Sequence, residues 1–184
     1  MNALLKGTHL LKRPVRALVW GGALVLLLVP AVAMQFTSEV DWTGSDFLVM
    51  GAMLAAACGA FELATRRARN NACVLAAGLA LGAAFLTVWI NLAVGIVGAQ
   101  GNPVNDLFFG VVAFALAASL VARFQPRPMV IAMAATGVVQ LCVGLYAANG
   151  QSPEAWVFTV AMCAAWWASS ALYRYGSVAA PNSR

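Results

Sequence analysis

Six long runs of apolar residues divide the chain, and the short segments between them hold nearly all of the charged residues. A helix of about 20 residues crosses the hydrocarbon layer of a bilayer, so each run is close to or above the length of a membrane span. None of the runs alternates between polar and apolar positions, which favours helices over the strands of a membrane barrel. The predicted spans are residues 17–34, 47–64, 72–99, 107–122, 129–148 and 155–173.

This pattern predicts an all-α integral membrane protein, a six-transmembrane-helix bundle. Residues 1–16 and 174–184 form the tails before and after the membrane domain, residues 17–173. Because the third run is the longest, we expect its helix to tilt or to extend beyond the bilayer, and the fourth run is the shortest. The composition agrees, with 62% hydrophobic and 9% charged residues and a mean hydropathy of +0.84. A soluble domain carries about 25% charged residues, so a water-soluble globule is excluded.

The basic residues occupy alternate segments between the runs. All 11 lie in the first tail, after the second run, after the fourth run or in the last tail: Lys6, Lys12, Arg13, Arg16, Arg66, Arg67, Arg69, Arg123, Arg127, Arg174 and Arg184. The other segments hold Glu39, Asp41, Asp46, Asp106 and Glu154, and Glu62 is the only acid on the basic side. Since positively charged loops stay in the cytoplasm, we expect both termini to be cytoplasmic in a bacterial inner membrane. The net charge of +5 then reflects topology and contact with lipid headgroups, and no nucleic acid is expected as a partner.

The first run also fits a secretory signal peptide, since basic residues precede it and Ala31-Val32-Ala33 follows Pro30. Cleavage after Ala33 would leave five spans. The apolar run continues to Met34 and is long enough to cross the membrane, so we expect it to stay uncleaved.

Residues with strong local preferences mark helix ends, packing faces and membrane interfaces. The predicted capping or opening residues are Ser45 or Asp46 for the second helix, Asn105 or Asp106 for the fourth, Pro128 for the fifth, and Ser152, Pro153 and Glu154 for the sixth. Small residues spaced four apart, which permit close helix packing, are Gly51, Ala55 and Gly59, then Gly78 and Gly82, then Ala161, Ala165 and Ser169. The expected interfacial aromatic residues are Trp20, Trp42, Trp156, Trp166, Trp167, Tyr173 and Tyr175.

The inventory of reactive residues is short. His9 is the single histidine and lies in the first tail, which excludes a haem held by paired intramembrane histidines. Cys58, Cys73, Cys142 and Cys163 form no CxxC motif and are expected to be small buried hydrophobic residues. The GxSxG, HExxH and phosphate-loop motifs do not occur. We therefore expect a protein that is not an enzyme and that holds no cofactor and no metal.

Glu62 is the acid nearest the membrane interior, and Arg66 follows it by four residues on the same helical face. An acid that precedes a base by this spacing favours a structural ion pair. The alternative is a proton-relay carboxylate, because ionisable groups inside a membrane are often functional.

Two primary amides lie inside predicted spans, Asn91 in the third and Gln140 near the middle of the fifth. Lipid offers such groups no hydrogen-bond partner, so both are expected to face the bundle interior. They predict either hydrogen bonds between helices or a polar path or ligand site.

Two stretches, read together, resemble a known family. The first is Met34-Gln35-Phe36-Thr37 with Glu39, Trp42 and Asp46-Phe47, and the second is Trp89-Ile90-Asn91-Leu92-Ala93-Val94-Gly95-Ile96 with Gly98, Asn102-Pro103 and Asn105. They resemble an uncharacterised family of small bacterial multi-span membrane proteins with a "MQFTxEVxW…DF" outer loop and a "WxNLAVGIxG…NPxN" segment. The resemblance implies a location and a topology and no mechanism.

Several of these polar residues are expected on the outer side of the membrane. The candidate polar or ligand site comprises Glu39, Asp41, Asn91, Asn102, Asn105, Asp106 and Gln140. The competing interpretation is a rigid loop lid whose asparagine side chains cap turns.

Our leading hypothesis for the function is a non-enzymatic packing or interaction component of the membrane. Its expected partners are the lipid bilayer and other membrane proteins or a second copy of the chain. The alternative is a small-solute or ion permease with a polar path near Asn91 and Gln140, and an intramembrane enzyme ranks third.

Overall fold

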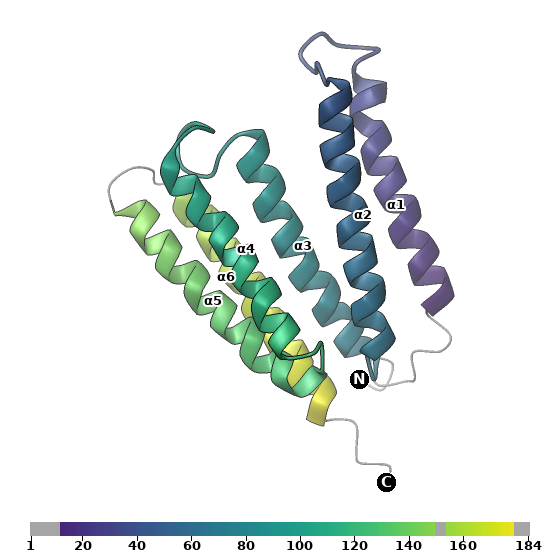
Figure 1. Ribbon diagram of the computed structural model, residues 1–184, viewed down its shortest axis with the longest axis vertical. Coiled ribbons are helices and arrows are strands. Elements are labelled where there is room, and N and C mark those ends of the chain that lie inside the picture. The colour runs from purple at the N-terminus through teal and green to yellow at the C-terminus, as the bar shows by residue number, and fades with distance from the viewer. Residues whose placement is uncertain (1–11, 150–153, 179–184) are drawn as a thin grey trace.

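The computed structural model describes residues 12–149 and 154–178, with side chains described for 15–149 and 155–178. The elements in order are α1 (Lys12–Ala33), α2 (Gly44–Arg67), α3 (Asn71–Ala93), the short 3₁₀ helix η2 (Pro103–Asn105), α4 (Asp106–Val121), α5 (Pro126–Ala148) and α6 (Glu154–Val178) (Figure 1). These ranges contain no strand, and six of the helices are long and apolar enough to cross a membrane. The all-α class is thus confirmed in the described part of the chain, and so is the presence there of six helices that could cross a membrane. His9, Ser152, Pro153 and Arg184 lie outside it.

The third span is shorter than the sequence predicts. Helix α3 ends at Ala93, so residues 94–99 belong to a loop and not to the predicted span 72–99. The chain turns there because Gly95 has φ +79°, a conformation that glycine adopts without steric cost. Helix α6, with 25 residues, is therefore the longest of the six, whereas α4 is the shortest, with 16, as expected.

Several helix ends also differ from the predicted positions. Helix α1 begins at Lys12, within the predicted first tail, and α6 continues to Val178, within the predicted last tail. Thr43, and not Ser45 or Asp46, is the N-cap of α2. Asp46 instead completes the capping box, because its carboxylate accepts the Thr43 N–H at 2.7 Å. Helix α5 opens at Pro126 rather than Pro128.

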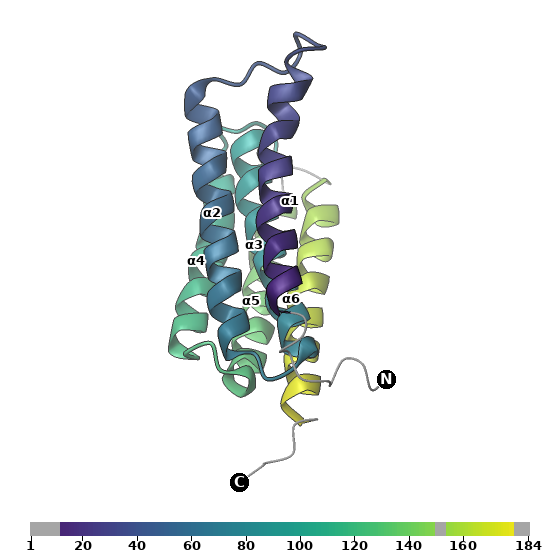
Figure 2. The same ribbon diagram turned by 90° about the vertical axis from the view of Figure 1, so that its right-hand side faces the viewer.

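The last four helices form a bundle, and the first two form a hairpin beside it. Within the bundle α3 packs against α4 and α6, and α5 packs against the same two helices, so α3 and α5 are diagonal partners. The hairpin joins the bundle through contacts between α2 and α3. In the view turned by 90° the hairpin stands in front of the bundle and the six helices run nearly parallel (Figure 2).

Hydroxyl and amide side chains link the helices of the bundle. Ser169 of α6 donates to the Ala76 carbonyl of α3, and Ser170 donates to the Val130 carbonyl of α5, both at 2.8 Å. Near the end of α6, Asn70 donates to the Gly176 carbonyl at 2.8 Å. The bundle also encloses Trp166 and Tyr173, which are 1% and 4% exposed and so are not the interfacial aromatic residues that the sequence suggested.

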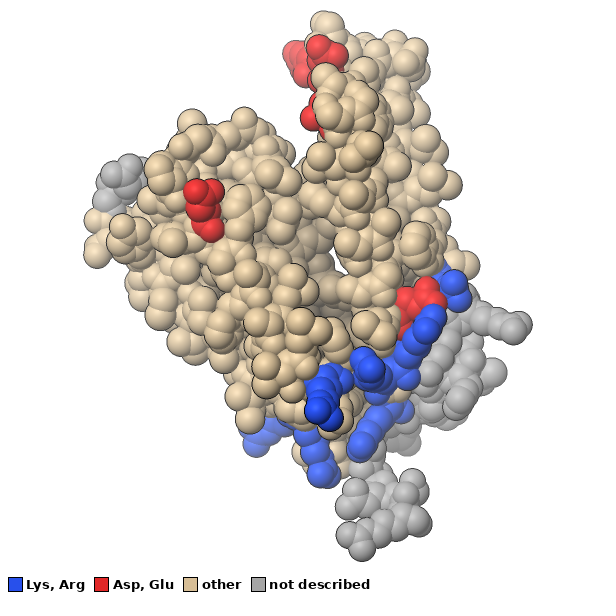
Figure 3. Space-filling view, viewed as in Figure 1, with Lys and Arg blue, Asp and Glu red and all other residues tan. Residues whose placement is uncertain are grey.

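The described charges lie at opposite ends of the molecule. Space-filling atoms of Lys and Arg gather at one end and those of Asp and Glu at the other, apart from one acid beside the basic group (Figure 3). We call these the basic end and the acidic end. The described residues that define the basic end are Arg16, Arg66, Arg67, Arg69, Arg123, Arg127 and Arg174, and those of the acidic end are Glu39, Asp41, Asp46 and Asp106.

Candidate functional site

Asn105 organises the segment that joins α3 to α4 at the acidic end. Its Oδ1 accepts the N–H groups of Ile96 at 3.1 Å and Val97 at 2.8 Å, and its Nδ2 donates to the Ala99 carbonyl at 3.0 Å. The residue is buried. Its Nδ2 also donates to the Val97 carbonyl at 3.4 Å, so one side chain satisfies four main-chain groups that a buried turn would otherwise leave without partners. Asn105 stands at the N-cap position of α4 without making the side-chain cap that the sequence suggested.

The end of α3 is tied to the same residue. Asn91 Nδ2 donates to the Asn105 main-chain carbonyl at 2.7 Å. A Cβ added at Gly95 would lie 2.8 Å from Asn105 Nδ2 and 3.0 Å from the Ala99 carbonyl carbon. A larger residue at position 95 would therefore collide with the turn as well as strain the backbone.

Two further amides complete this turn. Gln100 Nε2 donates to the Leu92 and Ala93 carbonyls at 2.7 and 2.6 Å, and so caps the carbonyl end of α3. Asn102 Oδ1 accepts the Val104 N–H at 3.0 Å and caps η2. Sequence reasoning missed Gln100, although an amide donor shortly after a helix end is a recognisable signal. Asparagine side chains thus cap turns within residues 94–105, which we call the lid, as the competing interpretation of the outer polar residues expected of them.

The predicted site residues fall into three groups. Asn91, Asn102 and Asn105 belong to the lid and its attachment to α3. Glu39, Asp41 and Asp106 are exposed, and the first two lie in the loop between α1 and α2, which stands apart from the lid (Figure 1). Gln140 lies on α5, the helix diagonal to α3, inside the bundle. The structure does not gather the predicted set into one site.

Gln140 is fully buried, and neither polar atom of its side chain has a hydrogen-bond partner among the described residues. Thr159 of α6 is equally buried, and its hydroxyl has no partner there either. The Thr159 side chain lies against Gly144, one helical turn from Gln140 along α5. Two more such atoms lie in the bundle: the indole Nε1 of Trp166, two turns along α6 from Thr159, and Oδ1 of Asn91 on α3. Sequence reasoning singled out Gln140 and missed Thr159 and Trp166.

The predicted ion pair of Glu62 is present. Its carboxylate accepts from Arg66 at 2.8 Å and also lies 3.3 Å from Arg16 Nε, so that it links α1 to α2 at the basic end. Both arginine side chains are exposed, so solvent screens the two pairs and they contribute little to stability. The arrangement holds the hairpin together and neutralises the one acid at this end.

Within the described ranges, no group of three or more His, Cys, Asp or Glu residues is placed to hold a metal ion. The four cysteines are free, and Cys142 is exposed while Cys58, Cys73 and Cys163 are buried. Cys163 Sγ donates to the Gly137 carbonyl at 3.5 Å, which fixes the register of α5 against α6.

The hairpin of α1 and α2 leaves most of its surface exposed. In the apolar stretch of each helix that could cross a membrane, only 6% of the residues are buried in α1 and 17% in α2, against 39% in α5 and 39% in α6. Helix α2 packs on α1 and on α3. A Cβ added at Gly51 of α2 would lie 3.8 Å from Leu27 of α1, and one added at Gly78 of α3 would lie 3.4 Å from Phe61 of α2. Its remaining face carries the exposed small residues Ala52, Ala55, Ala56 and Gly59, which we call the small face of α2.

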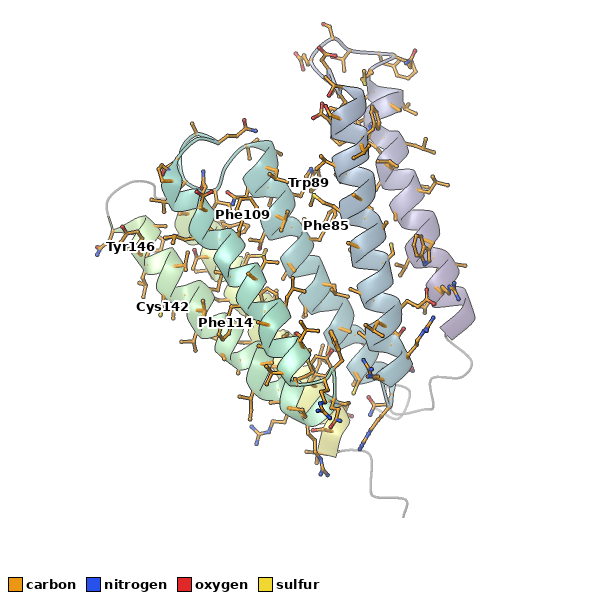
Figure 4. All side chains as sticks on the ribbon, in the orientation of Figure 1. Phe85, Trp89, Phe109, Phe114, Cys142 and Tyr146 are labelled. Carbon is orange, nitrogen blue, oxygen red and sulfur yellow. The ribbon has the colours of Figure 1, made fainter. Side chains whose placement is uncertain are left out.

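At the acidic end the hairpin and the bundle separate, and the molecular surface is notched between them (Figure 3). Phe85 and Trp89 project from α3 on the side of α2, below this notch (Figure 4). Their rings lie 6.1 Å apart between centroids.

No protein-family model, no curated protein and no solved structure matches this chain. The geometry of the described residues is what bears on function.

Proposed function

We propose that this chain is a non-enzymatic protein of a bacterial inner membrane, with both termini in the cytoplasm, and that its α1–α2 hairpin binds a transmembrane helix of another membrane protein. The basic end supports the orientation, because positively charged segments are retained in the cytoplasm. The unequal packing of the helices supports the proposed interaction, because α1 and α2 are long enough to cross the membrane but bury few of their residues within the molecule.

The small face of α2 gives the proposed partner a place to pack. Lipid tails solvate apolar side chains as well as another helix does, so helices associate in membranes through close backbone approach at small residues. Ala52, Ala55, Ala56 and Gly59 are exposed, and a Cβ added at Gly59 would meet nothing within 4 Å. A partner helix can therefore approach α2 there without displacing any part of this chain.

A permease is the alternative function, and the positions of Asn91 and Gln140 weaken the case for it. A path past Asn91 and Gln140 requires both to line one water-accessible route. Asn91 is engaged with the lid through its Nδ2, and Gln140 lies on the diagonal helix and is fully buried. We therefore rank solute transport below interaction.

Gly59→Leu tests the interaction, with Gly110→Leu as the matched control. Both glycines are exposed on helices and have open space around an added Cβ, but Gly110 lies on α4, away from the hairpin. After mild detergent extraction from native membranes, Gly59→Leu should recover about tenfold less partner than the wild type, because the leucine holds the two helices apart. Gly110→Leu should recover the normal amount.

Equal recovery by the two variants would contradict the proposal. A photocrosslinking residue at position 56 identifies the occupant directly, because it lies on the small face of α2. An adduct of twice the mass of the chain would assign this face to a second copy, and adducts with lipid alone would leave it without a protein partner. Either result would overturn the proposed partner.

A further inference from the structure

We propose that the interior of the α3–α6 bundle binds a small uncharged molecule that both donates and accepts hydrogen bonds, held between Gln140 of α5 and Thr159 of α6. This inference is independent of the proposed function, because it concerns the inside of the bundle and not the surface of the hairpin.

The hydroxyl of Thr159 differs from its neighbours in what it contacts. Thr87, Thr136 and Ser119 are also buried, and each donates to the carbonyl four residues earlier in its own helix at 2.7–2.8 Å. This local bond is the usual way in which a hydroxyl is satisfied inside a membrane helix. Thr159 makes no such bond, and its side chain lies against Gly144 of the facing helix.

Because Gly144 has no side chain, Thr159 of α6 can lie against α5 one helical turn from Gln140. Any side chain at position 144 would overlap the hydroxyl and the methyl group of Thr159, so the glycine makes room for them. Gln140 and Gly144 are one turn apart on the same face of α5, a separation of about 6 Å along the helix axis. That is close to the length of two hydrogen bonds in series, so one small molecule can bridge the amide and the hydroxyl.

Three buried residues without a described side-chain hydrogen-bond partner lie on α5 and α6. Gln140 supplies a donor and an acceptor, Thr159 supplies a hydroxyl, and the indole Nε1 of Trp166 supplies a donor on the same face of α6 as Thr159. Trp167, the next residue, donates to the Ala134 carbonyl, so Gln140 lies between the levels of Thr159 and Trp166. Leaving all of these groups without partners in an apolar core would be strongly unfavourable.

The surroundings restrict the chemistry of the bound molecule. The buried polar residues of the described chain are all Asn, Gln, Ser or Thr, so no buried charge is placed to neutralise an ion. The bundle interior is otherwise apolar: Met133 and Met162 lie in the same hydrophobic cluster as Trp166, and Phe108 lies in a second cluster. The molecule is therefore uncharged and small, either water or a solute such as a polyol. Buried waters make about three hydrogen bonds to protein groups, which these side chains can supply.

Thermal unfolding of the full-length protein in lipid nanodiscs tests the site with three variants. Thr159→Val removes the unpartnered hydroxyl, and Gln140→Met replaces the amide with an apolar side chain of similar shape. Thr136→Val is the matched control, because Thr136 is as buried as Thr159 but is satisfied within its own helix. If the site is occupied, each of the first two variants should lower the Tm by about 2–4 °C more than the control does. A Tm equal to or above that of the wild type in both would overturn the proposal, since removing unsatisfied groups from an empty core stabilises a protein.

A second measurement uses the wild-type protein and does not depend on how the variants fold. With ¹⁵N-labelled tryptophan, and with Trp166→Phe to assign the signal, the Trp166 indole N–H should show magnetisation transfer from water. Glycerol is the probe for a solute: loss of the transfer on its addition assigns the site to polyols, and retention assigns it to water. No transfer from water or glycerol, with no exchange of the indole proton in D₂O, would overturn the proposal.

Discussion

The side chain of Asn105 makes more hydrogen bonds to the main chain than an asparagine that only caps a helix would make. Its Oδ1 accepts the N–H groups of Ile96 and Val97, and its Nδ2 donates to the Ala99 carbonyl, while the main-chain carbonyl of Asn105 accepts from Asn91 Nδ2. As a cap it would serve one N–H group of α4. Its position opposite the turn at Gly95 lets it serve the whole lid, because the positive φ there folds the chain back over the amide.

Replacing Asn105 with alanine should destabilise the protein by about 2–3 kcal/mol, since it leaves the Ile96 and Val97 N–H groups buried without partners. The Tm should fall by about 5 °C or more, measured by thermal unfolding in nanodiscs. Asn102→Ala removes a single hydrogen bond, to the Val104 N–H, and is the control with the smaller expected loss. Equal effects of the two substitutions would show that Asn105 does not organise the lid.

At the scale of the element, the residue at which a helix begins depends on which of several suitable neighbouring side chains caps it. Thr43, Ser45 and Asp46 all have side chains that can cap α2, and they lie within one turn. In the structure Thr43 Oγ1 accepts the Asp46 N–H at 3.4 Å, and the Asp46 carboxylate accepts the Thr43 N–H at 2.7 Å. The reciprocal pair satisfies two main-chain donors, which a cap at Ser45 would not do.

Thr43→Ala should therefore weaken the first turn of α2 by about 1 kcal/mol, whereas Ser45→Ala should have a smaller effect. Hydrogen exchange of the main-chain amides in residues 44–48 measures this directly, and the alanine at position 43 should speed it about fivefold. If Ser45→Ala has the larger effect, the cap lies where the sequence alone suggested.

At the scale of the whole molecule, the charged residues and the buried residues are distributed differently among the helices. The basic end gathers arginines from the first turns of α1, the end of α2 and the turn after it, the segment from the end of α4 to the start of α5, and the last turns of α6. The bundle α3–α6 is tightly packed, but the hairpin α1–α2 contributes few buried residues. The charges are thus distributed over the whole molecule, whereas most of the buried residues lie in four of its helices.

The orientation gives a prediction for the intact cell. A reporter that is active only in the cytoplasm should work when fused after Arg184, and one that is active only outside should work when inserted after Gly101, in the lid. Removing the positive charges of Arg66, Arg67 and Arg69 should reduce the fraction of molecules in this orientation. A fusion after Arg184 that is active only outside the cell would contradict the topology and the assignment of the lid to the outer face.

Residue patterns along the chain were sufficient for the number of spans, the all-helical class, the alternation of charge and the ion pair of Glu62 with Arg66. Each of these depends on length, hydropathy or a spacing within one helix, so neighbours in the sequence contain the information. The tertiary structure decided where α3 ends, which asparagine holds the lid and which hydroxyl in the core lacks a local partner. Those features depend on groups that meet across helices or across a turn, such as Asn91 with Asn105 and Gly144 with Thr159. In a membrane, where small and apolar residues occur on every helix, one-dimensional patterns do not specify which of them will meet.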